Sequence, residues 1–198
     1  AGVVTLEPLG AAPRAGSAGP AIPGVKVHIL DDAGEELGVR QVGEIAVDSP
    51  FRMAAYFRDP EQTKQALHGD WFLTGDLGYL DEDGFMYLVD RRTDLMLVGG
   101  VNVYPAEIEA TISHHPAVRD VAVFGIPDDE WGESVYCIVQ AKTGETIDLD
   151  DLRAYAEANM AKYKVPRGWE VRDELPRTDA GKLLKRVLRD EFWTDRAL

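Results

Sequence analysis

The chain has 198 residues, a formal net charge of −14, and 45% hydrophobic and 28% charged residues, which is the composition of a soluble globular protein of one large or two small domains. The acidic charge argues against general nucleic-acid binding, and no apolar run approaches the roughly 20 residues that would span a bilayer. A lone cysteine, Cys137, and no sign of a signal peptide favour a reducing, cytoplasmic location without a transmembrane segment.

The first ninety residues predict a mostly β module. Residues 10–24 are rich in Gly, Ala and Pro and predict an irregular loop. A short helix is expected over 59–67, with Pro60 in its first turn. The acidic turn "DEDG" predicts a hairpin in which Gly84 takes a positive φ. Alternating apolar and polar side chains, or apolar runs, predict strands at 25–30, 43–49, 77–80 and 85–90.

The pattern changes after the charged stretch 90–94. Helices are expected from Pro105 to 115, from an N-cap at Asp148 to 161, and from Lys182 onward. Strands are expected at 95–98, 117–127, 133–142 and 168–176.

This order of elements predicts an α+β protein in two parts. Residues 1–90 form a small, mostly β subdomain that resembles a distorted β-barrel. Residues 91–94 mark the boundary between the two parts, and residues 95–198 form a compact α+β domain.

Several residues could carry chemistry on their own evidence. Asp76 follows a glycine in "LTGDL" and can accept two hydrogen bonds from a vicinal diol, although an aspartate that bonds its own turn is an open alternative. Lys182 stands at the tip of a Pro- and Gly-containing loop, where a solvated lysine at a helix start is the alternative. Basic residues gather in "AKYKVPRGW" and in the last helix, either as solvated faces or as a site for a small polyanion.

Metal and thiol chemistry find little support. His114 and His115 end a helix, where interaction with its negative end is the better interpretation. No Cys/His spacing typical of zinc is present, so we expect no metal site, and Cys137 in "VYCIVQ" predicts a buried strand thiol.

Multi-residue stretches across the whole chain resemble the C-terminal part of AMP-forming acyl-CoA synthetases, in the adenylate-forming superfamily. They occur in family order: "GEIAV", "YFRDPEQT", "GDWFLTGDLGYLDEDGF", "DRRTDLMLVGGVNVYPAEIEA", "HPAVRDVAVFGIPDDEWGESV" and "YKVPRGWEVRDELPRTDAGKLLKRVLR". The resemblance implies that the full enzyme converts a carboxylic acid, fatty or related, and ATP to acyl-AMP, then passes the acyl group to CoA.

The resemblance also implies roles for individual residues near the nucleotide. Asp76 matches the aspartate that binds the ribose, and Arg91 matches an arginine that contacts ribose or phosphate. Lys182 matches the catalytic lysine of adenylation, whose ammonium would neutralise charge as the carboxylate attacks the α-phosphate. Thr93 falls at the hinge about which the C-terminal lid domain rotates.

A second group of residues is implied to contact CoA. Gly99 and Gly100 match a backbone stretch that lines the pantetheine passage, where a Cβ would obstruct the channel. An aromatic face and cations suit adenine and the 3′-phosphate. The matching residues are Trp131, Tyr163, Lys164 and Arg167. The alternatives are that Trp131 only packs at a loop and that "YKVPR" only joins a helix to a strand.

The sequence departs from the family at three points. Thr93 stands where Asp or Lys is usual, and Val101 stands where many short-chain and aryl synthetases have Glu. The phosphate loop, the Mg²⁺-associated glutamate and most of the acyl pocket would lie upstream, so we expect a fragment that needs the N-terminal portion of the same enzyme and is nearly inactive alone. The alternatives are an acyl-AMP ligase, an adenylation domain that loads a carrier protein, and a non-catalytic interaction module.

Overall fold

A computed structural model describes residues 3–10 and 12–193 of the chain. The chain divides into two compact units, Ala1–Thr93 and Asp94–Leu198, and each unit has a hydrophobic core of its own. The first unit is mostly β and the second is α+β, which confirms the predicted fold class. Among the described residues, no helix is long and apolar enough to cross a membrane.

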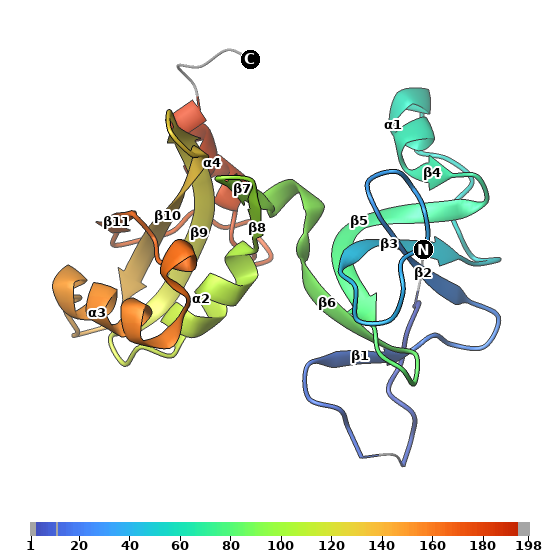
Figure 1. Ribbon diagram of the computed structural model, residues 1–198, viewed down its shortest axis with the longest axis horizontal. Helices are drawn as coiled ribbons and strands as arrows, with labels where there is room; N and C mark the ends of the chain where they lie inside the picture. Colours follow the sequence, from blue (N-terminus) through green and yellow to red (C-terminus); the bar gives the residue numbers. More distant parts are fainter. Residues whose placement is uncertain (1–2, 11, 194–198) are drawn as a thin grey trace. The chain divides into compact units, whose positions relative to one another are not determined.

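The first unit is a curled antiparallel sheet with one short helix (Figure 1). Its strands pair in the order β1-β6-β5-β3-β2, and β4 pairs with β5. The elements are β1 (Ser17–Pro20), β2 (Lys26–Leu30), β3 (Gly43–Asp48), α1 (Pro60–Gln65), β4 (Leu67–His68), β5 (Trp71–Leu80) and β6 (Phe85–Arg91), followed by a 3₁₀ turn, η1 (Arg92–Asp94).

Local sequence signals explain most of this unit. Asp59 caps α1 by accepting a hydrogen bond from the Gln62 amide, and Pro60 occupies the first turn as predicted. Gly84 closes the β5–β6 hairpin at φ 78°, also as predicted. The prediction of an irregular loop over 10–24 was wrong at 17–20, because β1 pairs with β6 there and this pairing depends on a distant strand.

The second unit is a five-stranded sheet between helices (Figure 1). Strand β10 pairs antiparallel with β9 on one side, and with β7 and the parallel strand β11 on the other. The elements are β7 (Met96–Val98), β8 (Val101–Val103), α2 (Pro105–Ser113), β9 (Val118–Asp128), β10 (Gly132–Ala141), α3 (Leu149–Asn159), η2 (Lys162–Lys164), β11 (Gly168–Val171) and α4 (Lys185–Trp193).

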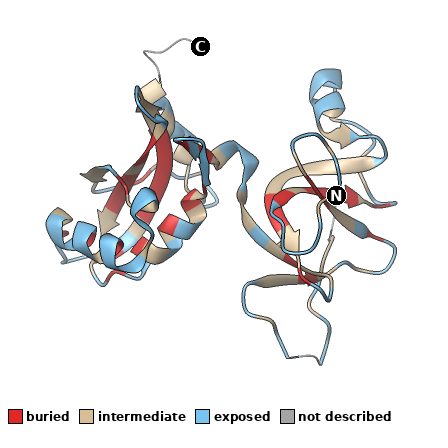
Figure 2. Ribbon diagram, in the orientation of Figure 1, coloured by how far each residue is buried: buried red, intermediate tan, exposed pale blue. Residues whose placement is uncertain are grey.

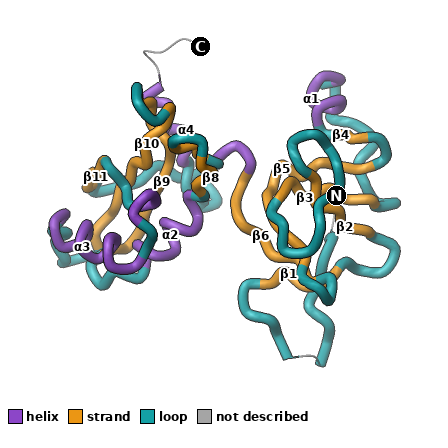
Figure 3. The backbone as a smooth tube through the Cα atoms, viewed as in Figure 1, coloured by secondary structure: helices purple, strands orange, loops and turns teal. Residues whose placement is uncertain are grey.

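Both faces of this sheet are buried, as the red segments of β9 and β10 in Figure 2 show. Side chains alternate along a strand, so Val121 and Val123 face α2 and α3 while Ala122 and Phe124 face α4. Leu188 of α4 is 1% exposed and belongs to the hydrophobic cluster on the same face of the sheet as Ala122 and Phe124. The sheet is thereby held as a rigid layer to which the surrounding loops, teal in Figure 3, are attached.

The predicted elements of the second unit are confirmed in order and type, with three corrections. Val101–Val103 forms a strand, β8, that the sequence did not predict. Strand β11 ends at Val171 rather than 176. Helix α4 begins at Lys185 rather than Lys182, because residues before it bridge back to the preceding segment: the Thr178 amide donates to the Lys182 carbonyl at 2.8 Å and the Leu184 amide to the Pro176 carbonyl at 2.8 Å.

Candidate functional site

Asp76 and Arg91 lie side by side in the first unit. They are register partners on the neighbouring strands β5 and β6, and Arg91 Nε is 3.3 Å from Asp76 Oδ1. The Asp76 side chain is 35% exposed and that of Arg91 is 61% exposed. A carboxylate has about four lone-pair positions, so Asp76 retains acceptor capacity for a diol while it pairs with Arg91.

The backbone around Asp76 is bent rather than regular. Gly75 takes φ 75°, and the β5–β6 register shifts between Leu77 and Gly78. The Thr74 hydroxyl donates to the Ile45 carbonyl and accepts from the Asp76 amide. Asp76 thus stands at a fixed irregularity within a strand, a feature that is common beside functional sites.

Lys182 lies on a tight turn of the second unit. The Lys182 amide donates to the Thr178 hydroxyl at 3.1 Å, and Gly181 takes φ 80° to close the turn. The Arg177 guanidinium donates to the Gly181 carbonyl at 2.5 Å. The Lys182 side chain is exposed and makes no ion pair with the described residues, so the turn presents a cation to solvent on a stiff base.

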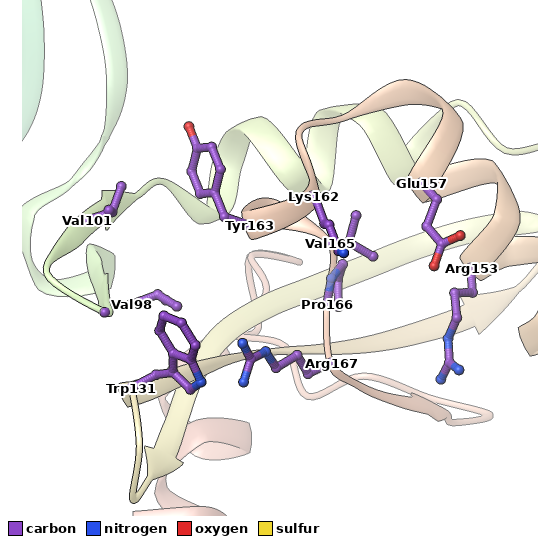
Figure 4. A pocket seen from close by; sticks show the side chains of 11 residues that line it. Val98, Val101, Trp131, Arg153, Glu157, Lys162, Tyr163, Val165, Pro166 and Arg167 are labelled. Carbon is purple, nitrogen blue, oxygen red and sulfur yellow. The ribbon is translucent and has the colours of Figure 1, made fainter.

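A pocket of about 1070 Å³ opens in the second unit (Figure 4). It brings together four residues from three separate stretches of sequence, Gly99, Trp131, Tyr163 and Arg167, all expected from the resemblance to contact CoA. The remaining lining residues are Val98, Val101, Arg153, Glu157, Lys162, Val165 and Pro166.

Gly99 and Trp131 form one wall together. The Gly99 amide donates to the Trp131 carbonyl at 2.9 Å, and the Gly99 backbone takes φ 58°. A Cβ built on Gly99 would lie 2.4 Å from Trp131 Cε3, so the indole ring rests directly on the glycine. Glycine is therefore needed here for its backbone angle and for its lack of a side chain.

A cation also lies over the indole ring of Trp131. The Arg167 guanidinium carbon is 4.8 Å from the Trp131 ring centre. Asp128 Oδ1 accepts hydrogen bonds from the Glu130 and Trp131 amides, and its Oδ2 lies 4.0 Å from Arg167. These amides, that of Trp131 first, hold the pKa of Asp128 below its ordinary value, with a smaller contribution from the charge of Arg167.

Two of the expected residues are not in the lining. Gly100 follows Gly99 in the turn between β7 and β8, takes φ 80°, and has open space where a Cβ would stand. Lys164 donates to Glu107 Oε1 at 2.5 Å and lies 5.5 Å from the centre of the Tyr163 ring. Partial burial disfavours its charge, but the interaction with Glu107 outweighs burial and raises the pKa of Lys164. Lys164 is thus engaged in a structural ion pair.

The sequence analysis missed two charged residues that line the pocket, Arg153 and Glu157, and included a third, Lys162, only as part of the basic cluster in "AKYKVPRGW". Arg153 and Glu157 stand one helical turn apart on α3, and Lys162 begins η2 (Figure 4). A surface helix with mixed charges gives no signal that it faces a pocket, because only the packing of α3 beside η2 decides this. The pocket therefore has a strip of apolar residues around Val98 and Val101 and a charged region on α3 and η2.

Other candidate groups of the second unit are structural. His115 is 6% exposed, with Nε2 3.2 Å from Asp151 Oδ2 and its ring edge against Tyr155. His114 Nδ1 contacts the Ala110 carbonyl at the helix end, as predicted. Cys137 is fully buried in β10, as predicted, and burial raises the pKa of its thiol. Within the described part of the chain, no three metal-ligating side chains are placed to hold an ion.

Residues 107–182 match the family model of the AMP-binding enzyme C-terminal domain. The chain is 45% identical over 187 residues to a 2-succinylbenzoate–CoA ligase of Geobacillus kaustophilus, covering 94% of the chain and 38% of that protein. It is 42% identical over 181 residues to the fatty acid–[acyl-carrier-protein] ligase ScoC of Streptomyces coeruleorubidus, covering 91% of the chain and 35% of ScoC.

Among solved structures, ATP-bound MatB from Rhodopseudomonas palustris superposes with a TM-score of 0.89 at 39% identity, covering 97% of the chain and 38% of MatB. The chain thus spans a little over a third of the length of the relatives that it matches. Residues 107–182 belong to the AMP-binding enzyme C-terminal domain family, and the chain is similar along nearly its whole length to AMP-forming acyl-CoA ligases. The resemblance inferred from the sequence is confirmed.

Proposed function

We propose that the whole protein to which this chain belongs is an AMP-forming acyl-CoA synthetase. It joins a carboxylic acid to ATP as acyl-AMP with release of pyrophosphate, and then transfers the acyl group to the thiol of CoA. The observation that carries the proposal is the pocket in which Gly99, Trp131 and Arg167 meet, in a chain similar to named CoA ligases. We also propose a cytoplasmic location, where ATP and CoA are available.

In the first half-reaction, Asp76 and Arg91 hold the nucleotide. The carboxylate of Asp76 accepts hydrogen bonds from the ribose hydroxyls, and Arg91, already paired with Asp76, offers N–H donors to ribose or phosphate. Both residues stand on paired strands, so their spacing is set by the sheet. In this proposal, the phosphate loop and the Mg²⁺ ligands lie in the rest of the protein, as the resemblance to the family implies.

Lys182 supplies charge for adenylation. Its ammonium neutralises the negative charge that develops as the carboxylate oxygen attacks the α-phosphate and pyrophosphate departs. A long side chain on a stiff, exposed turn suits a cation that is needed for one step and then withdrawn. The withdrawal requires the second unit to rotate about the hinge at 91–94, with Thr93 as the pivot.

In the second half-reaction the pocket of the second unit receives the acceptor. The indole of Trp131 and the phenol of Tyr163 offer faces to adenine, while Arg167 offers a cation to phosphate. Gly99 and Gly100 leave room for the pantetheine arm. In this proposal Lys164 does not contact CoA itself. Its ion pair with Glu107 holds the segment that carries Tyr163.

One relative supports a second candidate. ScoC is named as a fatty acid–[acyl-carrier-protein] ligase, so a carrier protein is the alternative acceptor. The cations at the pocket favour CoA, since they match the phosphates of its nucleotide. The proposal covers both aromatic and fatty carboxylic acids as substrates, because relatives are named for both 2-succinylbenzoate and fatty acids.

The test uses the full-length protein. Pyrophosphate release is measured with a panel of carboxylic acids, and the product is then chased with CoA or with a phosphopantetheinylated carrier protein. We expect acyl-AMP formation followed by transfer to CoA. Lys182→Ala should slow adenylation about 100-fold or more, without changing transfer from preformed acyl-AMP. The proposal is wrong if no acid supports pyrophosphate release, or if Lys182→Ala leaves adenylation unchanged.

A further inference from the structure

Ion pairs flank Thr93 on both sides. Thr93 is exposed and is the last residue of the first unit, in the middle of the 3₁₀ turn η1. The residue before it, Arg92, pairs with carboxylates of the first unit. The residue after it, Asp94, pairs with a lysine of the second unit. Each neighbour of Thr93 is therefore tied to a different unit.

The tie on the first unit is a forked guanidinium contact. Arg92 donates from one terminal nitrogen to Glu44 at 2.8 Å and from the other to Asp32 at 2.8 Å. Glu44 is a residue of β3 with only 13% of its side chain exposed, whereas Asp32 is 94% exposed. The Glu44 contact carries most of the effect, because a partly buried pair is screened less by solvent than an exposed one.

The tie on the second unit runs back to its central sheet. Lys185 Nζ is 3.4 Å from Asp94 Oδ2 and 3.1 Å from Glu109 Oε1. The same Glu109 oxygen accepts a hydrogen bond from the Val123 amide of β9 at 2.8 Å. All three charged side chains are 20–29% exposed. A strand amide, a helix carboxylate and a helix ammonium thus link the first residue of the second unit to its core.

We propose that Arg92 and Asp94 anchor the two sides of the hinge and confine rotation between the units to the backbone of Thr93. This proposal rests on the proposed function, which requires such a rotation. Arg92, Asp94 and Lys185 are positioning residues that act through the hinge.

The anchor on the second unit also governs the placement of Lys182. Lys185 opens helix α4 and lies three residues after Lys182, whose turn is held by Thr178. Asp94 and the Lys182 turn are therefore joined through the same helix start. With the anchor intact, a rotation at Thr93 moves Lys182 together with the rest of the second unit as a rigid body. With the anchor loosened, Lys182 takes many positions.

The most direct test removes the anchor charge with the least change of shape. Asp94→Asn leaves Lys185 paired with Glu109, so the core of the second unit keeps its ion pair. Arg92→Gln removes the charge of the anchor on the first unit. Asp94→Glu is the conservative variant, because it keeps the negative charge at position 94. Asp190→Asn is the matched control, because it removes a carboxylate of α4 that faces Arg186 at 3.7 Å with both side chains well exposed.

Hinge freedom is measured on the full-length protein by double electron–electron resonance. Spin labels are attached at Glu61→Cys in the first unit and Glu145→Cys in the second, both exposed positions outside the candidate site. We expect the distance distribution to broaden in Asp94→Asn and in Arg92→Gln. Asp94→Glu and Asp190→Asn should keep the distribution of the parent protein.

Kinetics give the second readout. Because the anchors touch neither nucleotide nor acceptor, kcat for adenylation should fall about tenfold while KM for ATP changes less than about twofold. The amplitude of the acyl-AMP burst should stay unchanged, which separates a hinge effect from a loss of folded enzyme. Thermal unfolding of each variant supports that separation.

The outcomes are distinguishable. If the parent protein forms no acyl-AMP with any acid, the proposed function fails, while the label distances still test the anchored hinge. If the parent is active but both anchor variants keep its distance distribution and its kcat, the anchoring proposal is overturned. If the burst amplitude falls in proportion to kcat, the residues act on folding and the proposal is likewise overturned.

Discussion

Replacing Gly99 with alanine tests whether that glycine supports the pocket through Trp131. Both Gly99 and Gly100 have positive φ, 58° and 80°, so Gly→Ala at either position costs about 1–2 kcal/mol for the left-handed backbone. They differ in what surrounds them. An added Cβ would lie 2.4 Å from the Trp131 ring at Gly99 but would meet no atom within 4 Å at Gly100.

The ring must move in Gly99→Ala, because no carbon pair tolerates such a distance. Moving the ring adds an overpacking cost of about 1–2 kcal/mol. It also separates the indole from Arg167, a cation–π contact worth about 0.5–1 kcal/mol at an exposed site. We therefore expect Gly99→Ala to lower the free energy of unfolding by about 2.5–5 kcal/mol, and Gly100→Ala by about 1–2 kcal/mol.

Urea unfolding of the 198-residue chain, followed by circular dichroism, measures both values. In the full-length protein, the two variants should also differ in KM for CoA, with Gly99→Ala about tenfold higher than Gly100→Ala, because the aromatic wall has moved. Adenylation should be equal in the two variants, since the wall takes no part in it. Equal destabilisation together with equal KM for CoA would refute the reasoning that Gly99 positions Trp131.

Three further predictions use single side chains. Asp128→Asn should be less stable than the parent chain at pH 7 in urea titrations, because the pKa of Asp128 is lowered in the folded state and its charge therefore stabilises the fold at pH values above the ordinary pKa of 3.8. The difference in stability should vanish as the pH falls through the folded-state pKa, and a difference that persists at low pH would contradict this prediction. Cys137 should react with a thiol reagent only after unfolding, because burial excludes the reagent and raises the pKa of the thiol; fast labelling of the native chain would disprove this. Asp76→Asn should raise KM for ATP about tenfold in the full-length protein through loss of charge-assisted hydrogen bonds, and an unchanged KM would remove Asp76 from the nucleotide site.

Much of the fold was predictable because its signals are local. A helix cap such as Asp148 acts on amides two or three residues away, and the alternation along 121–124 follows from the geometry of a strand. Turn glycines such as Gly84 act through their own backbone angles. These effects need no knowledge of the rest of the chain.

The candidate site was likewise predictable in part from the sequence and in part only from the structure. Asp76, Arg91 and Lys182 stand in motifs several residues long, so a resemblance to a family singles them out one by one. The structure adds that Asp76 and Arg91 are register partners, and that Lys182 lies on a turn ahead of α4 rather than at its start. The second fact depends on a bridge between Arg177 and Leu183, which competes with helix formation.

Sequence alone determined the family, the order of elements and the buried or turn-forming character of single residues, because each depends on neighbours along the chain. Only the tertiary structure decided that Arg153 and Lys162 line the pocket, that Trp131 rests on Gly99, and that the flanks of Thr93 are tied to different units. The physical reason is distance along the chain. These contacts join residues tens of positions apart, and their partners come together only after the sheets have brought their strands into register.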